Sequence, residues 1–198
     1  MRTYLLTLCL LISLIGRTQS LTDNRQGDLL GKGHLNLGMN VGEGYRGTYS
    51  TIDFVNPHLQ YFLHNGWSIA LEATYLESRT TYKYKFGGVG LSTRYYFLRQ
   101  KRFALFAQAG ALYGKSQYYP FQFDPRDPQY VFNHNLQVNV GLGIHYRLAK
   151  RWSVEVLGGR SWLSNPTQPG SAGLLVAPSI PVDYNRWQVS FGVHYRLK

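Results

Sequence analysis

Hydrophobic and polar residues alternate along the last stretch of the chain, residues 187–198. One face carries Trp187, Val189, Phe191, Val193, Tyr195 and Leu197, and the other carries Gln188, Ser190, Gly192, His194 and Arg196. A period of two residues is that of a β-strand with one apolar and one polar face. The sequence GIHYRL at residues 143–148 recurs as GVHYRL at residues 192–197, so this kind of strand occurs more than once.

Eight alternating runs follow residue 32. They span residues 33–41, 52–63, 67–76, 86–97, 103–113, 135–148, 152–160 and 187–198. Pro57 lies within the second run and predicts a bulge or the start of a strand at that point. Three connections are short (64–66, 98–102 and 149–151), and four are long (42–51, 77–85, 114–134 and 161–185). Alternating short turns and long loops predict an all-β fold, an eight-stranded antiparallel up-and-down transmembrane β-barrel, with both termini on the periplasmic side.

The alternation does not by itself say which face lies inside the barrel, because a soluble lipocalin-like barrel would bury the apolar face. Two features favour the inverted arrangement of a membrane barrel. Aromatic residues gather on the apolar face near the short turns: Trp67, Tyr95, Phe97, Phe103, Tyr146, Trp152 and Tyr195. Glycines, which leave room for larger side chains in a narrow lumen, are frequent on the polar face: Gly38, Gly88, Gly90, Gly110, Gly141, Gly143 and Gly192.

The N-terminus has the pattern of a secretory signal: Arg2, an apolar run over residues 5–15, and small residues at 18 and 20. The apolar run is too short for a spanning helix, which needs about 20 residues. We therefore expect a cleaved signal peptide over 1–20, a loose periplasmic leader over 21–32 and an outer-membrane barrel domain over 33–198. The only cysteine, Cys9, leaves with the signal, so no disulfide is expected.

The chain is basic, with a formal charge of +11 that falls to +9 once Arg2 and Arg17 leave with the signal. A basic chain can bind nucleic acid. A secreted barrel makes that partner a poor fit, and we expect none. Lipid phosphates lie at both membrane surfaces, and cationic side chains at the ends of the barrel can contact them.

The last strand also carries a sharper motif in Ser190, Gly192, Tyr195 and Leu197, which have the spacing polar, any, Gly, two of any, aromatic, any, hydrophobic. In this motif and in its whole pattern the chain resembles the small OmpA/OmpX-type, porin-like outer-membrane β-barrel family. The resemblance implies a place in the bacterial outer membrane, contact with lipids and lipopolysaccharide, and recognition of the motif by the barrel-assembly machinery. The chain departs from the family by ending in Leu197-Lys198 where a terminal Phe is usual.

Charged residues on the polar faces are the candidate functional residues. Pairing each hairpin symmetrically about its short turn places His58 opposite Glu72, and His145 opposite Glu155. The predicted lumen charge network consists of His58, Glu72, Arg94, His145, Arg147, Glu155 and Arg196. It either fills a narrow lumen with paired charges, or it forms a polar gate in which a carboxylate favours imidazolium.

Some outer-membrane barrels that resemble this one modify lipid A, and the deacylase among them uses a His-x-Ser pair that this chain lacks. We therefore predict no catalytic residues. The sequence also has no metal-ligand or nucleotide-binding signature, so no metal or cofactor is expected. The leading hypothesis is a non-enzymatic structural or surface-interaction role through the long extracellular loops. A narrow or gated channel for small solutes or ions is the alternative, followed by a lipid A-modifying enzyme.

Two of the long loops are rich in aromatic residues, at 82–85 and 118–123. They form either an adhesive surface that binds an extracellular partner or an extension of the strands beyond the membrane. The sequence leaves these two interpretations open.

Overall fold

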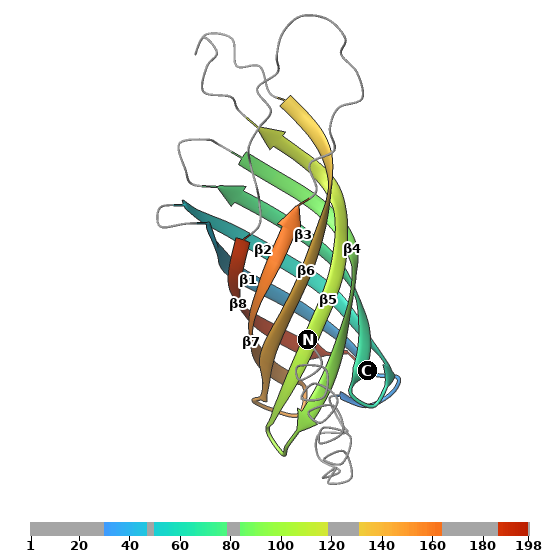
Figure 1. Cartoon of the computed structure of the whole chain (residues 1–198). Coiled ribbons are helices and arrows are strands. Elements are labelled where there is room, and N and C mark those ends of the chain that lie inside the picture. Colours follow the sequence, from blue (N-terminus) through green and yellow to red (C-terminus); the bar gives the residue numbers. More distant parts are fainter. Residues whose placement is uncertain (1–29, 47–49, 79–83, 119–130, 164–185, 198) are drawn as a thin grey trace, which may run out of the picture.

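The computed structural model describes residues 30–46, 50–78, 84–118, 131–163 and 186–197. These residues form eight strands: β1 (Leu35–Arg46), β2 (Ser50–His64), β3 (Trp67–Ser78), β4 (Tyr84–Arg99), β5 (Phe103–Tyr118), β6 (Val131–Arg147), β7 (Trp152–Leu163) and β8 (Arg186–Arg196). Each strand pairs antiparallel with the next, and β8 pairs with β1, so a strongly tilted barrel closes (Figure 1). The predicted eight-stranded up-and-down barrel is confirmed. Among the described residues no helix is both long enough and apolar enough to cross a membrane.

The strands run further than predicted at the end of the barrel opposite the short turns, which we call the long-loop end. The predicted loop 42–51 was wrong, because β1 continues to Arg46 and only residues 47–49 separate it from β2. The ladder holds there although Glu43 occupies an outward position where the alternation calls for an apolar residue. Lys85 pairs with Gln117, which confirms the strand-extension interpretation for these positions. The rest of the 118–123 stretch lies outside the described residues.

Pro57 does not sit at a bulge, contrary to the prediction. It pairs with Met39 of β1, and the β2–β3 ladder is interrupted between Val55 and His58 without a change of register. Proline has no N–H to donate, and this accounts for a local gap in the ladder. The register shift in this hairpin lies instead between Phe62 and His64, next to the short turn.

The predicted leader, residues 21–32, is not loose at its end. Leu30 is 2 % exposed and packs inside the barrel among Phe62, Tyr96 and Phe106. Its carbonyl accepts a hydrogen bond from the backbone N–H of Gly66, at 2.8 Å. Burial of an apolar side chain in an apolar opening is favourable, because it removes both surfaces from water. A search for a period of two residues does not detect a single buried leucine of this kind. The predicted signal peptide, 1–20, lies outside the described residues.

The outer face of the barrel is apolar. Side chains in its middle are between 59 and 64 % exposed: Leu71, Val89, Leu91 and Leu142. Six of the seven aromatic residues predicted near the short turns pair across neighbouring strands: Trp67 with Tyr95, Phe103 with Tyr146, and Trp152 with Tyr195. The seventh, Phe97, lies at a register shift between Tyr96 and Leu98. A soluble lipocalin-like barrel would bury the apolar face, so the inverted arrangement is the one observed.

The inner face is filled by side chains that the glycines make room for. A Cβ at Gly143 would overlap the ring of Phe106, and one at Gly192 would overlap Asn40 and lie 2.9 Å from Glu155 Cγ. Two apolar clusters lie inside the barrel. One is near the short turns and contains Leu30, Phe62, Tyr96, Ala104, Phe106 and Leu157. The other is near the long-loop end and contains Ile52, Phe54, Leu76 and Phe86.

Candidate functional site in the barrel lumen

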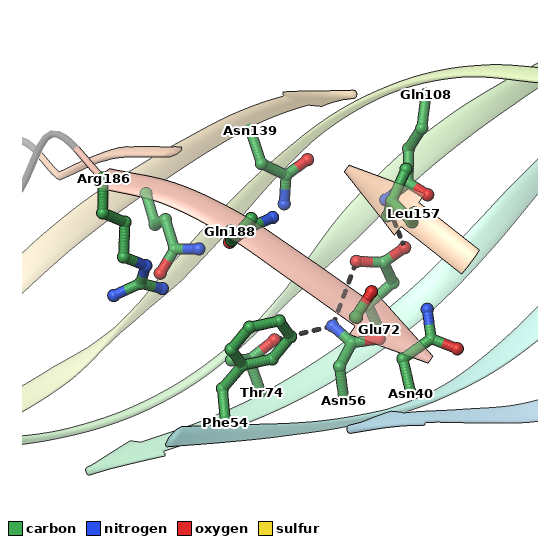
Figure 2. Close-up of a pocket in the computed structure, with 12 residues that line it drawn as sticks. Asn40, Phe54, Asn56, Glu72, Thr74, Gln108, Asn139, Leu157, Arg186 and Gln188 are labelled. Carbon is green, nitrogen blue, oxygen red and sulfur yellow. Dashed lines mark hydrogen bonds between the residues drawn. The ribbon is translucent and has the colours of Figure 1, made fainter. Parts of the chain in front are cut away.

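A polar layer lies between the two apolar clusters, and Glu72 is one of its centres. Glu72 is 2 % exposed. Its Oε1 accepts hydrogen bonds from Ser92 Oγ and, at 3.4 Å, from Gln108 Nε2. Its Oε2 accepts a hydrogen bond from Asn56 Nδ2 at 3.3 Å (Figure 2). Both oxygens of this buried carboxylate therefore have partners, as a buried charge requires.

Glu155 is the second centre, and its partners come from three other strands. Arg94 Nη1 of β4 lies 2.8 Å from Glu155 Oε2, and both side chains are at most 1 % exposed. Asn40 Nδ2 of β1 donates to Glu155 Oε1 at 2.9 Å. His194 Nε2 of β8 lies 2.9 Å from Oε2. Because a buried ion pair is stable only when its remaining oxygens are also bonded, Asn40 and His194 complete the Arg94–Glu155 pair.

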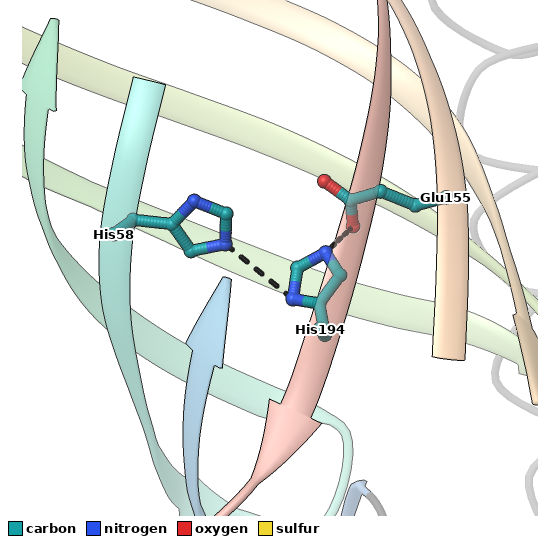
Figure 3. A group of neighbouring side chains, drawn as sticks. All are labelled: His58, Glu155 and His194. Carbon is teal, nitrogen blue, oxygen red and sulfur yellow. Dashed lines mark hydrogen bonds and ion pairs between the residues drawn. The ribbon is translucent and has the colours of Figure 1, made fainter. Parts of the chain in front are cut away.

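Three buried histidines surround this ion pair. His58 Nε2 lies 3.4 Å from His194 Nδ1, and the other ring nitrogen of His58 lies 3.3 Å from the carbonyl oxygen of Asn56 (Figure 3). The ring of His145 is 5.7 Å from that of His194, centroid to centroid. Neither ring nitrogen of His145 has a hydrogen-bond partner. We call His58, His145, His194, Glu155 and Arg94 the lumen histidine cluster.

The structure brings together most of the predicted lumen network. His58 pairs with Glu72, and His145 pairs with Glu155, in the registers that the sequence predicted. The expected acid–base contacts within these pairs were wrong, because Glu155 contacts His194 and Glu72 contacts neutral polar groups. Arg147 and Arg196 are only half-buried, near the short turns, and stand apart from the cluster. They extend past the buried layer because their strands end there.

Sequence reasoning missed the role of His194, although it placed this residue on the polar face. Glu155 pairs directly with Gly192, two residues from His194 on the same face. The missing side chain at Gly192 lets Glu155 lean towards its diagonal neighbour, which lies within reach of a long side chain. The sequence signal that could have indicated this contact was Gly192, a glycine directly opposite the buried carboxylate of Glu155.

Chemically, the cluster has the groups of a metal site and of a proton relay. One ligand atom each from His58, Glu155 and His194 lies within 4.8 Å of the others. The predicted absence of metal-binding residues therefore rested on sequence spacing alone, which does not show residues brought together from β2, β7 and β8. A Ser–His catalytic pair is not formed by the nearest candidate. His194 pairs with Ser153 across the β7–β8 ladder, but both His194 nitrogens face other residues.

A polar pocket extends from the cluster towards the long-loop end of the lumen (Figure 2). Asn40 and Asn56 line it, and both also contact the cluster, Asn40 through Glu155 and Asn56 through His58. Arg186 and Gln188, near the start of β8, line its other part. The cluster is therefore adjacent to space that polar side chains line.

The residues of the predicted assembly motif occupy alternate faces of β8. Ser190 and Gly192 face the lumen, whereas Tyr195 stacks against Trp152 at 4.9 Å between centroids. Leu197 is 47 % exposed, and its N–H donates to the carbonyl of Leu35 at 2.8 Å. Recognition of this motif by the assembly machinery stays a prediction.

No protein-family model matches the chain, and no curated protein matches its sequence. Solved structures do match. The N-terminal β-barrel domain of Pseudomonas aeruginosa OprF has a TM-score of 0.54 at 14 % identity, covering 83 % of this chain and 98 % of that domain. Neisserial surface protein A has a TM-score of 0.51 at 10 % identity, covering 82 % of this chain and 95 % of its own. At such low identity the likeness concerns the fold, and the chain has the fold of the small eight-stranded outer-membrane β-barrels of the OmpA/OmpX type.

Proposed function

We propose that the chain is an integral protein of the bacterial outer membrane, with its outer face in contact with lipids and lipopolysaccharide. The exposed apolar band supports this location, since soluble monomeric proteins rarely expose an apolar surface of this size to water. Phe103 and Tyr113 mark the two edges of the band on β5. Ten residues of strand span about 33 Å, or about 25 Å in height at a tilt of about 40°, which is the height of the apolar band of such barrels.

In this arrangement the short turns face the periplasm and the long connections face outside. Both termini are then periplasmic, and the barrel-assembly machinery acts from that side. Basic residues at both ends suit phosphate groups of the lipids, as Arg99 and Lys150 do near the short turns and Lys115 does near the long-loop end.

We further propose that the protein is non-enzymatic and has a structural or surface-interaction role. The observation that carries this proposal is the filled lumen, in which two apolar clusters enclose a buried, hydrogen-bonded polar layer. Eight strands leave an interior just wide enough for side chains, whereas open aqueous channels need more strands. A barrel that neither conducts nor catalyses acts through its surface. The longest connections, 119–130 and 164–185, are the places for an extracellular partner to bind.

The proposal predicts that the barrel conducts no ions. The chain refolded into a planar lipid bilayer is expected to show no single-channel conductance between pH 5 and pH 8. A deletion of Leu30 and the residues before it serves as a matched comparison, because it opens one end of the lumen and leaves the polar layer in place. Steady conductance by the intact chain would contradict the closed lumen.

The alternative function is a narrow or gated channel, and the polar pocket next to the lumen histidine cluster is the observation that favours it. The same recording separates the two functions. A channel gated by the cluster would conduct in a pH-dependent way, and Glu72→Gln or Glu155→Gln would abolish that dependence. Silence at every pH in the wild-type chain and in both variants would leave the surface role as the function.

A further inference from the structure

Gly38 brings two histidine side chains together inside the barrel. In the ladders on either side of β1, Gly38 pairs with His58 of β2 and with His194 of β8. Because residue 38 has no side chain, the two rings meet in front of it, with centroids 4.9 Å apart (Figure 3). A Cβ at position 38 would lie 2.8 Å from His194 Nδ1 and closer still to His58 Nε2. The glycine therefore keeps open the space beside these two nitrogens.

In each ring, the nitrogen that points away from the other ring has a partner, and this partner determines which nitrogen carries the proton. His58 Nδ1 is 3.3 Å from the carbonyl oxygen of Asn56, which can only accept a hydrogen bond, so Nδ1 carries the proton. His194 Nε2 is 2.9 Å from the Glu155 carboxylate that also contacts Arg94, and this negative charge favours a proton on Nε2. His58 Nε2 and His194 Nδ1 are then two lone pairs that face each other at 3.4 Å.

Two facing lone pairs repel unless an electropositive centre lies between them. Two nitrogens bound to one tetrahedral zinc ion, at bond lengths of about 2.0–2.1 Å, are about 3.3–3.4 Å apart. The observed separation of 3.4 Å fits this geometry. Histidines that bind metals also donate their other N–H to a carboxylate or a backbone carbonyl. Glu155 and Asn56 occupy these two outer positions.

His145 adds a third buried imidazole beside this pair. It is 1 % exposed, its ring lies 5.7 Å from that of His194, and both of its nitrogens lack a hydrogen-bond partner. An unpartnered buried polar group calls for an explanation, and a bound ion is one. The charge balance is also suitable, because Arg94 offsets the charge of Glu155, so the cation meets imidazole nitrogens rather than an unpaired arginine.

We propose that the barrel lumen contains a binding site for one transition-metal ion of the zinc type. His58 Nε2 and His194 Nδ1 are its ligands, Glu155 orients His194, and the His145 ring lies next to the site. Imidazole ligands suit Zn²⁺, Cu²⁺ and Ni²⁺, whereas Mg²⁺ and Ca²⁺ prefer oxygen. The polar pocket lined by Asn40 and Asn56 lies next to the site, on its long-loop side.

The test is Zn²⁺ binding by the whole chain, refolded into detergent micelles and stripped with EDTA. Titration calorimetry and metal analysis after gel filtration are expected to give one Zn²⁺ per barrel, and Mg²⁺ is expected not to bind. His58→Gln and His194→Gln should each weaken binding about 100-fold or more, and Glu155→Gln about 10- to 100-fold, by loss of the outer partner. His64→Gln, which removes an exposed histidine outside the cluster, is the matched control and should bind as the wild type does.

Two results would overturn the site. If the wild-type chain binds no Zn²⁺, the space between the rings holds a proton or a water molecule instead. If His58→Gln and His194→Gln bind as tightly as the wild type, the ion sits on surface histidines. Folding of each variant is checked by heat-dependent mobility in SDS gels. Where a lumen variant does not fold, electron paramagnetic resonance of Cu²⁺ bound to the His64→Gln chain decides. Splitting from two or three nitrogens supports the site, and an oxygen-only spectrum overturns it.

Discussion

At the scale of single residues, glycines on the inner face determine where large side chains pack in the lumen. Gly38 lets the His58 and His194 rings meet, and Gly192 lets Glu155 reach across to His194. The sequence predicted that inner-face glycines make room in the lumen. It did not say for which partners, because those are set by the stagger between strands that lie far apart along the chain.

Two glycines of this barrel make a matched pair for measuring that effect. A Cβ at Gly143 would overlap Phe106 and lie 2.8 Å from the Val156 carbonyl oxygen, whereas one at Gly158 would meet nothing within 4 Å. We expect Gly143→Ala to lower the free energy of unfolding by about 1–3 kcal/mol, the usual cost of overpacking. Gly158→Ala should be neutral, or stabilising by up to about 1 kcal/mol, because alanine loses less backbone entropy than glycine. Urea unfolding in lipid vesicles, followed by tryptophan fluorescence, measures both, and equal effects would contradict the prediction.

At the scale of elements, the alternation of residue types predicted the number, order and inner face of the strands. It also predicted the pairing of His145 with Glu155, because a tight turn fixes which residues lie opposite each other. His58 and Glu72 pair as predicted even though the β2–β3 register shifts between Phe62 and His64. The strand ends at the long-loop side were not predicted. Beyond the apolar band an outward residue has no reason to be apolar, so the alternation ends at Glu43 while the backbone ladder continues.

Leu30 is an element-scale feature that no periodicity reveals, and its energetic role can be measured. We expect Leu30→Ala to lower the free energy of unfolding by about 2–5 kcal/mol, since it empties part of the apolar cluster near the short turns. Lys32→Ala is the control, because Lys32 is exposed and uses its backbone N–H to bond Asn65 Oδ1. If the two variants unfold at the same urea concentration, Leu30 contributes nothing to the stability of the barrel.

At the scale of the whole molecule, polarity is arranged in two directions. From outside to inside it runs from apolar to polar, and along the lumen it runs from apolar through polar to apolar. The sequence predicted the first arrangement, from an apolar outer face to a polar inner face. The second was not predicted, because Phe54, Phe86 and Phe106 occupy inner positions within runs where the pattern predicted polar residues.

The proposed orientation in the membrane leads to a prediction on intact cells. Protease added from outside should cleave within the long connections 119–130 and 164–185, and leave the short turns, including Lys150 and Arg151, intact. An epitope tag placed after Lys198 should remain protected until the outer membrane is permeabilised. Immunoblotting of fragment sizes checks both points. Cleavage at the short turns of intact cells would reverse the orientation.

The pairing between β1 and β8 contains no register shift and is continuous from Asn36–Arg196 to Tyr45–Trp187. It differs from the other strand pairings in that no connection of the chain spans it. The strands therefore form a ring with no structural beginning, and Leu35 and Leu197 are hydrogen-bonded neighbours across it. A circular permutant that links these two ends and starts at another short turn would keep every strand pair of the barrel. The cyclic order of the strands, rather than the point at which translation starts, defines this molecule.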